Sequence, residues 1–222
     1  MIKIPKNMLS SSKCSNLWYL SIPKNACSSV KMSIFYENFG FSFPEISHPW
    51  RYGALIHIHQ LYRTKKLTNS DKQKLKKKGG RLLVIIRNPL DRFVSAYVEK
   101  ILLNVKSHKN FDNLAKLKNI EKQFLTGEYE SRIVRDHFQP QSFWLGEGGD
   151  VSYALCTLDN ITEWLNLSVE SNKTKVNNTT LIEMKNQARE FMAYSAVFAK
   201  TFEADMHLYD IARNKKEYIK HG

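Results

Sequence analysis

The sequence has few of the residues that stabilise small secreted domains or hold structural metals. Its 222 residues include only three cysteines, which are odd in number and far apart: Cys14, Cys27 and Cys156. This spacing argues against a disulfide framework and gives no indication of a zinc site. We therefore expect no bound metal. The low cysteine content is typical of a protein from a reducing cytoplasm.

Long apolar runs are also missing. The first apolar run, residues 17–22, is far too short to span a bilayer, and residues 1–16 are polar, without the apolar core of a signal peptide. The sequence therefore predicts no stable membrane insertion. With 42% hydrophobic residues, the chain is long enough for one well-buried domain and short for two, so we expect residues 1–222 to form a single domain.

Acidic residues are outnumbered by basic ones. The chain has 21 Asp and Glu against 34 Lys and Arg, which gives a net charge of +13. Such a charge predicts an anionic partner, which could be nucleic acid, membrane lipid, an acidic polysaccharide or a phosphate-rich cofactor. Charge alone does not choose among these. No nucleic-acid-binding motif is evident, so we expect no nucleic-acid partner.

Glycine is absent between residues 1 and 39, and the glycine-rich loop of nucleotide hydrolases, G-x-x-x-x-G-K-[ST], does not occur. Residues 17–31 nevertheless have the pattern of a strand, a tight loop and a helix. The apolar run from Leu17 to Ile22 predicts a buried strand that Pro23 ends. Three apolar residues share one face of the following helix: Val30, Ile34 and Phe35. Ser28 and Ser29 offer hydroxyl groups that can cap its start.

The loop between this strand and helix has the features of an anion site. Only small side chains separate Lys24 from the helix: Ala26, Cys27, Ser28 and Ser29. The backbone can therefore wrap closely around a phosphate at the helix N-terminus, where Lys24 adds a positive charge. This interpretation is a phosphate-binding loop. The alternative is an ordinary strand-to-helix turn with a chance lysine.

A second buried strand, residues 81–86, ends in a charged turn. Three residues suit the cap, first and third positions of the next helix: Asn88, Pro89 and Asp91. Arg87 is then left at the carboxyl end of the strand, where ligands bind in open α/β sheets, and Ser95 lies further along the helix. This helix should continue to about residue 103 and bury four residues: Phe93, Val94, Tyr97 and Ile101. For Arg92, phosphate binding and a salt bridge near Glu99 both remain open.

These two stretches resemble the two cofactor motifs of carbohydrate sulfotransferases. The matching segments are I-P-K-N-A-C-S-S-V-K at residues 22–31 and I-R-N-P-L-D-R-F-V-S-A-Y at residues 86–97. The family uses 3′-phosphoadenosine 5′-phosphosulfate (PAPS). The likeness is closest to the group containing chondroitin 4-O- and HNK-1 sulfotransferases, with the uronyl 2-O-sulfotransferases next. The resemblance implies a P-loop-like sulfotransferase fold and transfer of a sulfuryl group to a hydroxyl acceptor, such as a carbohydrate.

The resemblance also implies roles for individual residues. In the family the first motif holds the 5′-phosphosulfate, and this role carries over to six positions: Lys24, Asn25, Ala26, Cys27, Ser28 and Ser29. An arginine and a serine of the second motif hold the 3′-phosphate, and these correspond to Arg87 and Ser95. Lys24 would also neutralise charge on the bridging oxygen as the 3′,5′-bisphosphate leaves.

Three histidines are candidates for the base that takes the acceptor's proton. His57 and His59 share one side of the chain if this stretch is extended, and the 2-O-sulfotransferases carry a similar catalytic His-x-His before the second motif. Satisfied structural imidazoles are the alternative. His137 begins a segment, residues 137–141, that resembles the family's His-Trp-x-Pro-Gln segment. The alternative role of this segment is to shape the acceptor cleft. We rank His59 first, His57 second and His137 third.

Alternating strands and helices predict an α/β fold, a three-layer domain with a mainly parallel central sheet. A third core strand is expected at residues 153–157, a helix at 119–133, and one or two helices over 180–211. Residues 104–118 are expected to form a loop. Thr68 and Asp71 match a capping box before a basic helix, residues 71–78. Its lysines should form a solvated face, and contact with the acceptor is the alternative.

Two other functions and one other compartment remain open. A nucleotide-dependent, kinase-like phosphotransferase is opposed by the missing Gly-Lys-Ser/Thr sequence. A non-catalytic polyanion-binding protein is supported by the charge alone. Vertebrate relatives are anchored in the Golgi, and the polar residues 1–16 favour a bacterial-type cytoplasmic enzyme over a protein of the Golgi lumen.

Overall fold

The computed structural model describes part of the chain, namely residues 9–11, 17–40, 68–77, 81–105, 107–146, 151–161, 179–214 and 218–220. His57 and His59 lie outside these ranges. The chain forms two compact units: the first comprises Met1–Ile86, Trp144–Ser171 and Ile211–Gly222, and the second Arg87–Phe143 and Asn172–Asp210. The single domain expected from the length of the chain stays a prediction.

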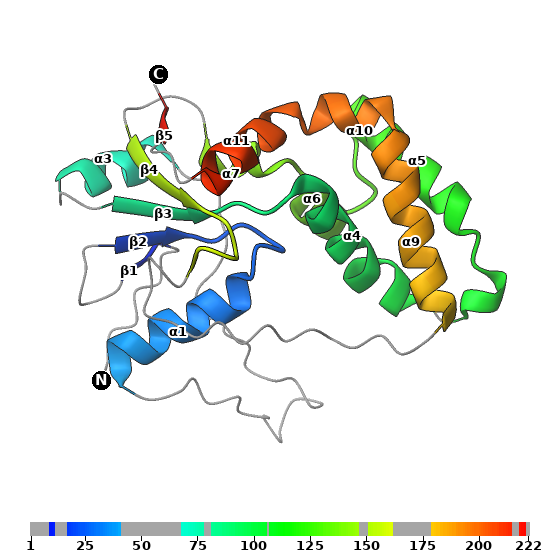
Figure 1. The fold of residues 1–222 in the computed structure, drawn as a ribbon, viewed down its shortest axis with the longest axis horizontal. Coiled ribbons are helices and arrows are strands. Elements are labelled where there is room, and N and C mark those ends of the chain that lie inside the picture. Colours follow the sequence, from blue (N-terminus) through cyan, green and yellow to red (C-terminus); the bar gives the residue numbers. More distant parts are fainter. Residues whose placement is uncertain are drawn as a thin grey trace. The chain divides into compact units, whose positions relative to one another are not determined.

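The first unit contains a five-stranded sheet with the order β1-β2-β3-β4-β5. The strands are Leu9–Ser11, Leu17–Leu20, Arg81–Ile85, Val151–Cys156 and Tyr218–Lys220. β2, β3 and β4 are parallel, and β1 and β5 pair antiparallel at the two edges. Figure 1 shows β3 between β2 and β4, with helices flanking the sheet. The predicted α/β class and mainly parallel sheet are confirmed.

Helix α1, Cys27–Phe39, packs on one face of this sheet. Its residues Val30 and Ile34 belong to one buried cluster with alternate residues of the three parallel strands: Tyr19, Leu83, Ile85, Ala154 and Cys156. The period of two places these strand residues on the same face. The predicted apolar face of the helix is thus confirmed, and Phe35 is also buried.

The start of α1 differs from the prediction. The helix begins at Cys27, and its N-cap is Ala26, which has a left-handed backbone conformation and makes no side-chain cap hydrogen bond. Ser28 and Ser29 therefore occupy the first turn of the helix, and the predicted serine cap is wrong. The chain turns into the helix through the backbone of Ala26, which leaves no cap position for a serine.

Helix α3, Asn69–Lys77, begins with the predicted capping box. The Thr68 hydroxyl donates to the Asp71 carboxylate at 2.6 Å, and the backbone N–H of Asp71 donates back to the hydroxyl oxygen at 3.2 Å. The backbone N–H of Thr68 also donates to Asp71. Lys72 is only 3% exposed, so the basic face of this helix is not solvated throughout.

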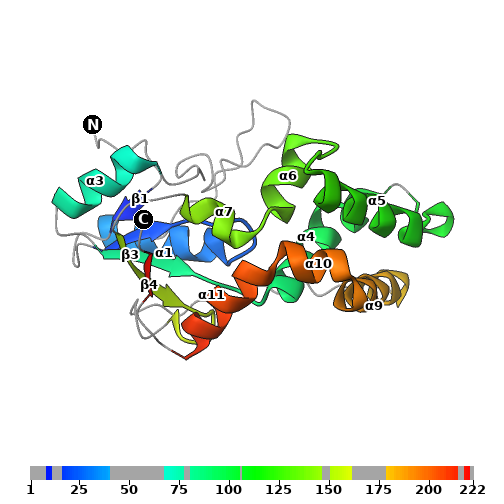
Figure 2. The same ribbon diagram turned by 90° about the horizontal axis from the view of Figure 1, so that it is seen from above.

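The later part of the chain is mainly helical. The elements are α4 (Pro89–Lys100), η1 (Leu102–Asn104), η2 (His108–Asn110), α5 (Asn113–Thr126), α6 (Arg132–Phe138), α7 (Gln141–Leu145), α9 (Thr179–Tyr194), α10 (Ala196–Thr201) and α11 (Glu203–Arg213). In Figure 2, α5 and α9 lie near one another, and α9 contacts both α4 and α5. No helix within the described ranges combines the length and apolar character that crossing a membrane requires.

Three predictions about this part of the chain are wrong. Residues 104–118 contain η2 and the start of α5, because the Asp112 side chain caps α5 by accepting from the backbone N–H of Ala115 at 2.9 Å. The same helix ends before Gly127, whose φ of 71° gives a left-handed C-cap, so it does not continue to residue 133. Residues 180–211 contain three helices, since Ser195 caps a new one at Ala196.

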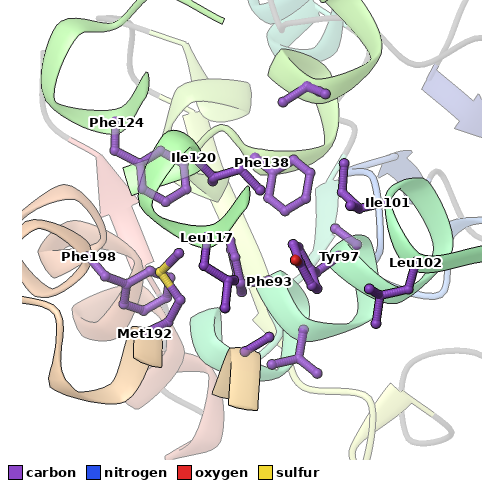
Figure 3. Packing of buried hydrophobic residues seen from close by; sticks show 14 of the residues in the cluster. Phe93, Tyr97, Ile101, Leu102, Leu117, Ile120, Phe124, Phe138, Met192 and Phe198 are labelled. Atoms are coloured by element: carbon purple, nitrogen blue, oxygen red, sulfur yellow. The ribbon is translucent and has the colours of Figure 1, made fainter. Parts of the chain in front are cut away.

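Aromatic rings fill the core of the second unit (Figure 3). Phe93 lies 5.2 Å from Phe138 and 5.7 Å from Phe198, measured between ring centroids. The four residues predicted as the buried stripe of α4 are all buried: Phe93, Val94, Tyr97 and Ile101. The Tyr97 hydroxyl finds a buried partner, since it donates to Asn113 Oδ1 at 2.6 Å.

Candidate functional site

The loop from Pro23 to Ala26 has a strained backbone. Lys24 and Ala26 have φ angles of 69° and 54°, in the left-handed region, and Asn25 lies between them. This conformation costs an L-residue roughly 1–2 kcal/mol, and such strain is concentrated at binding and catalytic sites. The small side chains of the loop suggested close wrapping of the backbone. They gave no sign of positive φ angles, because neither residue is a glycine.

Asn25 fixes this loop to the sheet. Its side chain is fully buried, and its Nδ2 donates to the backbone carbonyl of Ile85 at 2.6 Å. Ile85 is the last residue of β3. The backbone N–H of Asn25 also donates to the carbonyl of Ile22 at 3.3 Å. The side chain of Asn25 therefore holds the shape of the loop, and its direct contact with a cofactor stays a prediction.

The loop leads directly into the N-terminus of α1. The first hydrogen bond of the helix joins the N–H of Val30 to the carbonyl of Ala26 at 3.1 Å. The N–H groups of the first helical turn precede this bond, and they carry the positive end of the helix dipole, which favours a bound anion. Lys24, Ser28 and Ser29 are partly exposed. The residues predicted for the phosphate-binding loop thus form a continuous strand-loop-helix structure.

Replacing Ala26 by glycine should stabilise the protein. Glycine adopts φ of 54° without the Cβ penalty, and this gain outweighs the extra entropy of the unfolded chain, so we expect about 1 kcal/mol of added stability. Urea denaturation measures the change. Ala115→Gly, at an exposed position in α5, is the matched control and should destabilise by a similar amount. A loss of stability for Ala26→Gly would contradict the left-handed conformation.

Lys31 is buried in α1. Its side chain is 1% exposed, and burial lowers the pKa of Lys31 from 10.5 to about 8, although the nearby Cys27 acts in the opposite direction. The folded state therefore binds fewer protons than the unfolded state between these pKa values. By proton linkage, the charge of Lys31 destabilises the fold fully below pH 8, and this effect disappears as the pH rises towards 10.5.

Lys31→Met should remove this dependence. Below pH 8 the variant should gain about 3 kcal/mol from the lost buried charge, and its advantage should shrink as the pH approaches 10.5. Urea denaturation of both proteins across this pH range measures the difference. Lys118→Met, at an exposed position in α5, should show no such trend. An advantage that stays constant with pH would rule out the titration of Lys31.

In the second unit, the backbone of Arg87 is held by a glutamine side chain. The N–H of Arg87 donates to Gln141 Oε1 at 2.9 Å, and Gln141 Nε2 donates to the Arg87 carbonyl at 2.8 Å. Asn88 caps α4 as predicted, and its Oδ1 accepts from the N–H groups of Leu90 and Asp91 at 3.0 and 3.3 Å. Gln141 thus holds both the N–H and the carbonyl of Arg87, the residue that is predicted to bind the 3′-phosphate.

The guanidinium of Arg87 is partly buried beside two charged groups. Burial lowers the pKa of Arg87, the carboxylate of Asp91 raises it, and Arg189 lowers it again. Asp91 forms an ion pair with Arg189 at 2.5 Å. Ser95 lies four residues after Asp91, on the same side of α4, and is partly exposed. An arginine stays protonated even when its pKa falls, so Arg87 offers a poorly hydrated cation to an anionic ligand.

Arg92 has a different environment. It is 1% exposed, and its Nη1 donates to the backbone carbonyl of Gln139 at 2.7 Å. This bond ties α4 to the chain just after α6. The observed contact is therefore with a backbone carbonyl, which was not among the roles considered from the sequence.

His137 is the only candidate base within the described residues. It is partly exposed near the end of α6, and its Nδ1 lies 2.8 Å from the backbone carbonyl of Ile133. A carbonyl oxygen can only accept, so Nδ1 carries the proton of this bond. In the neutral ring Nε2 is then the basic nitrogen, as a proton acceptor requires.

Two residues near Arg87 were not predicted as functional. Gln141 is the last residue of the segment 137–141 that resembles a family segment, but no role was predicted for it. Asp205 is fully buried in α11, and its carboxylate accepts from the N–H groups of Gln141 and Ser142 at 2.5 and 2.8 Å. No local sequence pattern points to Asp205, because its partners lie far away in the chain.

A comparison with known proteins agrees with the motifs. The model of the sulfotransferase family matches residues 7–216, nearly the whole chain and both motif stretches. No curated protein and no solved structure matches the chain significantly. Membership in this family implies PAPS-dependent transfer of a sulfuryl group to a hydroxyl acceptor. The chain, with its strained loop at the start of α1 and its anchored Arg87, belongs to the sulfotransferase family.

Proposed function

We propose that the protein transfers the sulfuryl group of PAPS to a hydroxyl group of a carbohydrate. The observation that carries this proposal is the loop from Lys24 to Ser29. Its two left-handed residues and the buried Asn25 shape the backbone at the N-terminus of α1, where an anion is favoured. The motif likeness to the chondroitin 4-O- and HNK-1 group supports a carbohydrate acceptor within the family.

The residues present fit the cofactor's anionic groups. The 5′-phosphosulfate suits the N–H groups at the start of α1 together with Lys24. The 3′-phosphate suits Arg87, whose planar guanidinium can donate two parallel hydrogen bonds, and Ser95, whose hydroxyl can donate a third. Both assignments extend the family's motif roles to this chain.

The proposed reaction is an in-line transfer. The bond between sulfur and the bridging oxygen breaks, a bond forms between sulfur and the acceptor oxygen, and a base takes the hydroxyl proton. The products are the sulfated acceptor and adenosine 3′,5′-bisphosphate. Lys24 stabilises the negative charge that develops on the bridging oxygen, and a histidine is the base. Positioning and charge stabilisation supply most of the rate, as they do in phosphoryl transfer.

The charge of the chain supports an acidic acceptor. A net charge of +13 raises the local concentration of polyanions and speeds their association. An acidic polysaccharide combines the hydroxyl groups that the reaction needs with the charge that the protein attracts.

A sulfate-transfer assay tests the proposed function. The protein is incubated with radiolabelled PAPS and a panel of acidic glycans, neutral glycans and small hydroxyl compounds. We expect transfer to a glycan, and in a parallel binding experiment stronger binding of adenosine 3′,5′-bisphosphate than of ATP. Transfer only to small compounds would refute the carbohydrate acceptor. If the two nucleotides bind equally well and no sulfate is transferred, the proposed function is refuted and the protein is a non-catalytic polyanion-binding protein.

Arg87→Ala should weaken the binding of adenosine 3′,5′-bisphosphate by roughly ten- to a hundredfold, because charge-assisted hydrogen bonds to the 3′-phosphate are lost. Arg87→Lys should restore little, since lysine cannot form the bidentate pair. Isothermal titration calorimetry measures both. Adenosine 5′-phosphate should bind the variants and the wild type equally well.

Arg132→Ala is the matched control for Arg87. Its side chain is 84% exposed and pairs with Asp136 four residues on, so we expect no change in nucleotide affinity. Unchanged bisphosphate affinity of Arg87→Ala would rule out the 3′-phosphate role of Arg87.

A further inference from the structure

The polypeptide changes from strand to helix at Arg87. β3 ends at Ile85, and the N–H of Ile86 still donates to the carbonyl of Cys156 at 2.8 Å, as in a continued ladder. Helix α4 begins at Pro89. Arg87 is thus past the end of the ladder and before the helix, where regular secondary structure supplies no partner for its peptide groups.

The side chain of Gln141 takes the place of that partner. It accepts from the N–H of Arg87 and donates to the carbonyl of the same residue, at 2.9 and 2.8 Å. This two-bond arrangement is the one that a neighbouring strand would make. Gln141 is fully buried, so water does not compete for either bond.

Gln141 is itself held at its backbone by Asp205. The two oxygens of this buried carboxylate accept from the N–H groups of Gln141 and Ser142 at 2.5 and 2.8 Å, at the first turn of α7. Hydrogen bonds to an ionised carboxylate are stronger than those between neutral groups. The carboxylate of α11 thus fixes the backbone from which the Gln141 side chain reaches Arg87.

We propose that Gln141, fixed by Asp205, is a positioning residue that sets the backbone of Arg87 so that its guanidinium meets the 3′-phosphate of the cofactor. This inference rests on the proposed function, because it assumes that Arg87 binds that phosphate. Gln141 does not touch the cofactor. It restricts the backbone conformation of Arg87. The pre-organised arginine then loses less conformational entropy when the 3′-phosphate binds.

The test compares nucleotides that differ only at the 3′ position. Gln141→Leu introduces an apolar side chain of similar size and removes both bonds to Arg87. We expect its affinity for adenosine 3′,5′-bisphosphate to fall roughly tenfold, while its affinity for adenosine 5′-phosphate stays the same. In an Arg87→Ala background the same substitution should cost nothing further, because it acts through the lost guanidinium.

A second variant and a control separate positioning from stability. Gln141→Glu keeps the acceptor for the Arg87 N–H but sets an oxygen against the Arg87 carbonyl. It should therefore also lose the preference for the bisphosphate over the monophosphate. This variant decides the test if Gln141→Leu does not fold. Gln123→Leu is the control: Gln123 is also a buried glutamine, 6% exposed, and its Oε1 accepts from the N–H of Glu130 at 3.0 Å. It should lower the melting temperature without changing the 3′ preference.

The outcomes distinguish the inference from the proposed function. If the wild type does not prefer the bisphosphate over the monophosphate, the proposed 3′-phosphate site fails, and the inference fails with it. If the wild type shows the preference and the folded Gln141 variants keep it in full, only the inference is overturned. An additive loss in the Arg87→Ala background would also overturn it, because Gln141 would then act independently of Arg87.

Discussion

Replacing Lys24 by alanine is expected to lower kcat for sulfuryl transfer by roughly a hundred- to a thousandfold, as the loss of an oxyanion donor does in other enzymes. The ammonium group is needed most when the leaving bisphosphate gains charge, so its loss should affect turnover more than cofactor binding. Steady-state kinetics with PAPS and calorimetry with the bisphosphate product measure the two effects separately.

The backbone conformation at Lys24 allows this substitution to test the side chain alone. With φ at 69°, alanine has the same left-handed strain as lysine, so the loss of rate reports on the ammonium group and not on a relaxed loop. Lys122→Ala, at an exposed position in α5, is the control and should keep full activity. An increase in KM at unchanged kcat would make Lys24 only a ground-state anchor for the cofactor.

Loss of the base should have the largest effect, roughly a hundred- to ten-thousandfold in rate with product binding retained. Alanine is placed in turn at His59, His57 and His137. The variant that lacks the base should also lose the acidic limb of the pH–rate profile, near the ordinary imidazole pKa of about 6.5. Stopped assays of sulfate transfer between about pH 5 and 9 measure both quantities.

His108→Ala is the control for these variants. Its Nε2 lies 2.8 Å from the carbonyl of Leu102, so His108 resembles His137 in its bond to a backbone carbonyl. It has no proposed role and should keep full activity. If all three candidate variants keep both their activity and the acidic limb, the base is not a histidine. The next candidates for the base are the carboxylates of Asp136 and Glu147. Asp136 forms ion pairs with Arg132 and Arg135.

Several elements were predicted correctly because their signals are local. The capping box of Thr68 and Asp71 and the cap of α4 by Asn88 join residues no more than three positions apart. The apolar stripe of α4 depends only on helical periodicity. The family motifs are also short and continuous, so the two candidate cofactor-binding stretches could be recognised from the sequence.

Only the tertiary structure decided how these stretches are shaped. The serine cap of α1 was wrong because Asn25 binds Ile85, 60 positions away, and the chain enters the helix through a left-handed Ala26. The anchoring of Arg87 depends on Gln141, 54 positions away, and the anchoring of Gln141 on Asp205, a further 64 positions on. The sequence by itself determined which residues carry the sulfotransferase motifs. The partners that fix those motifs come from distant segments, which no local pattern of side chains can reveal.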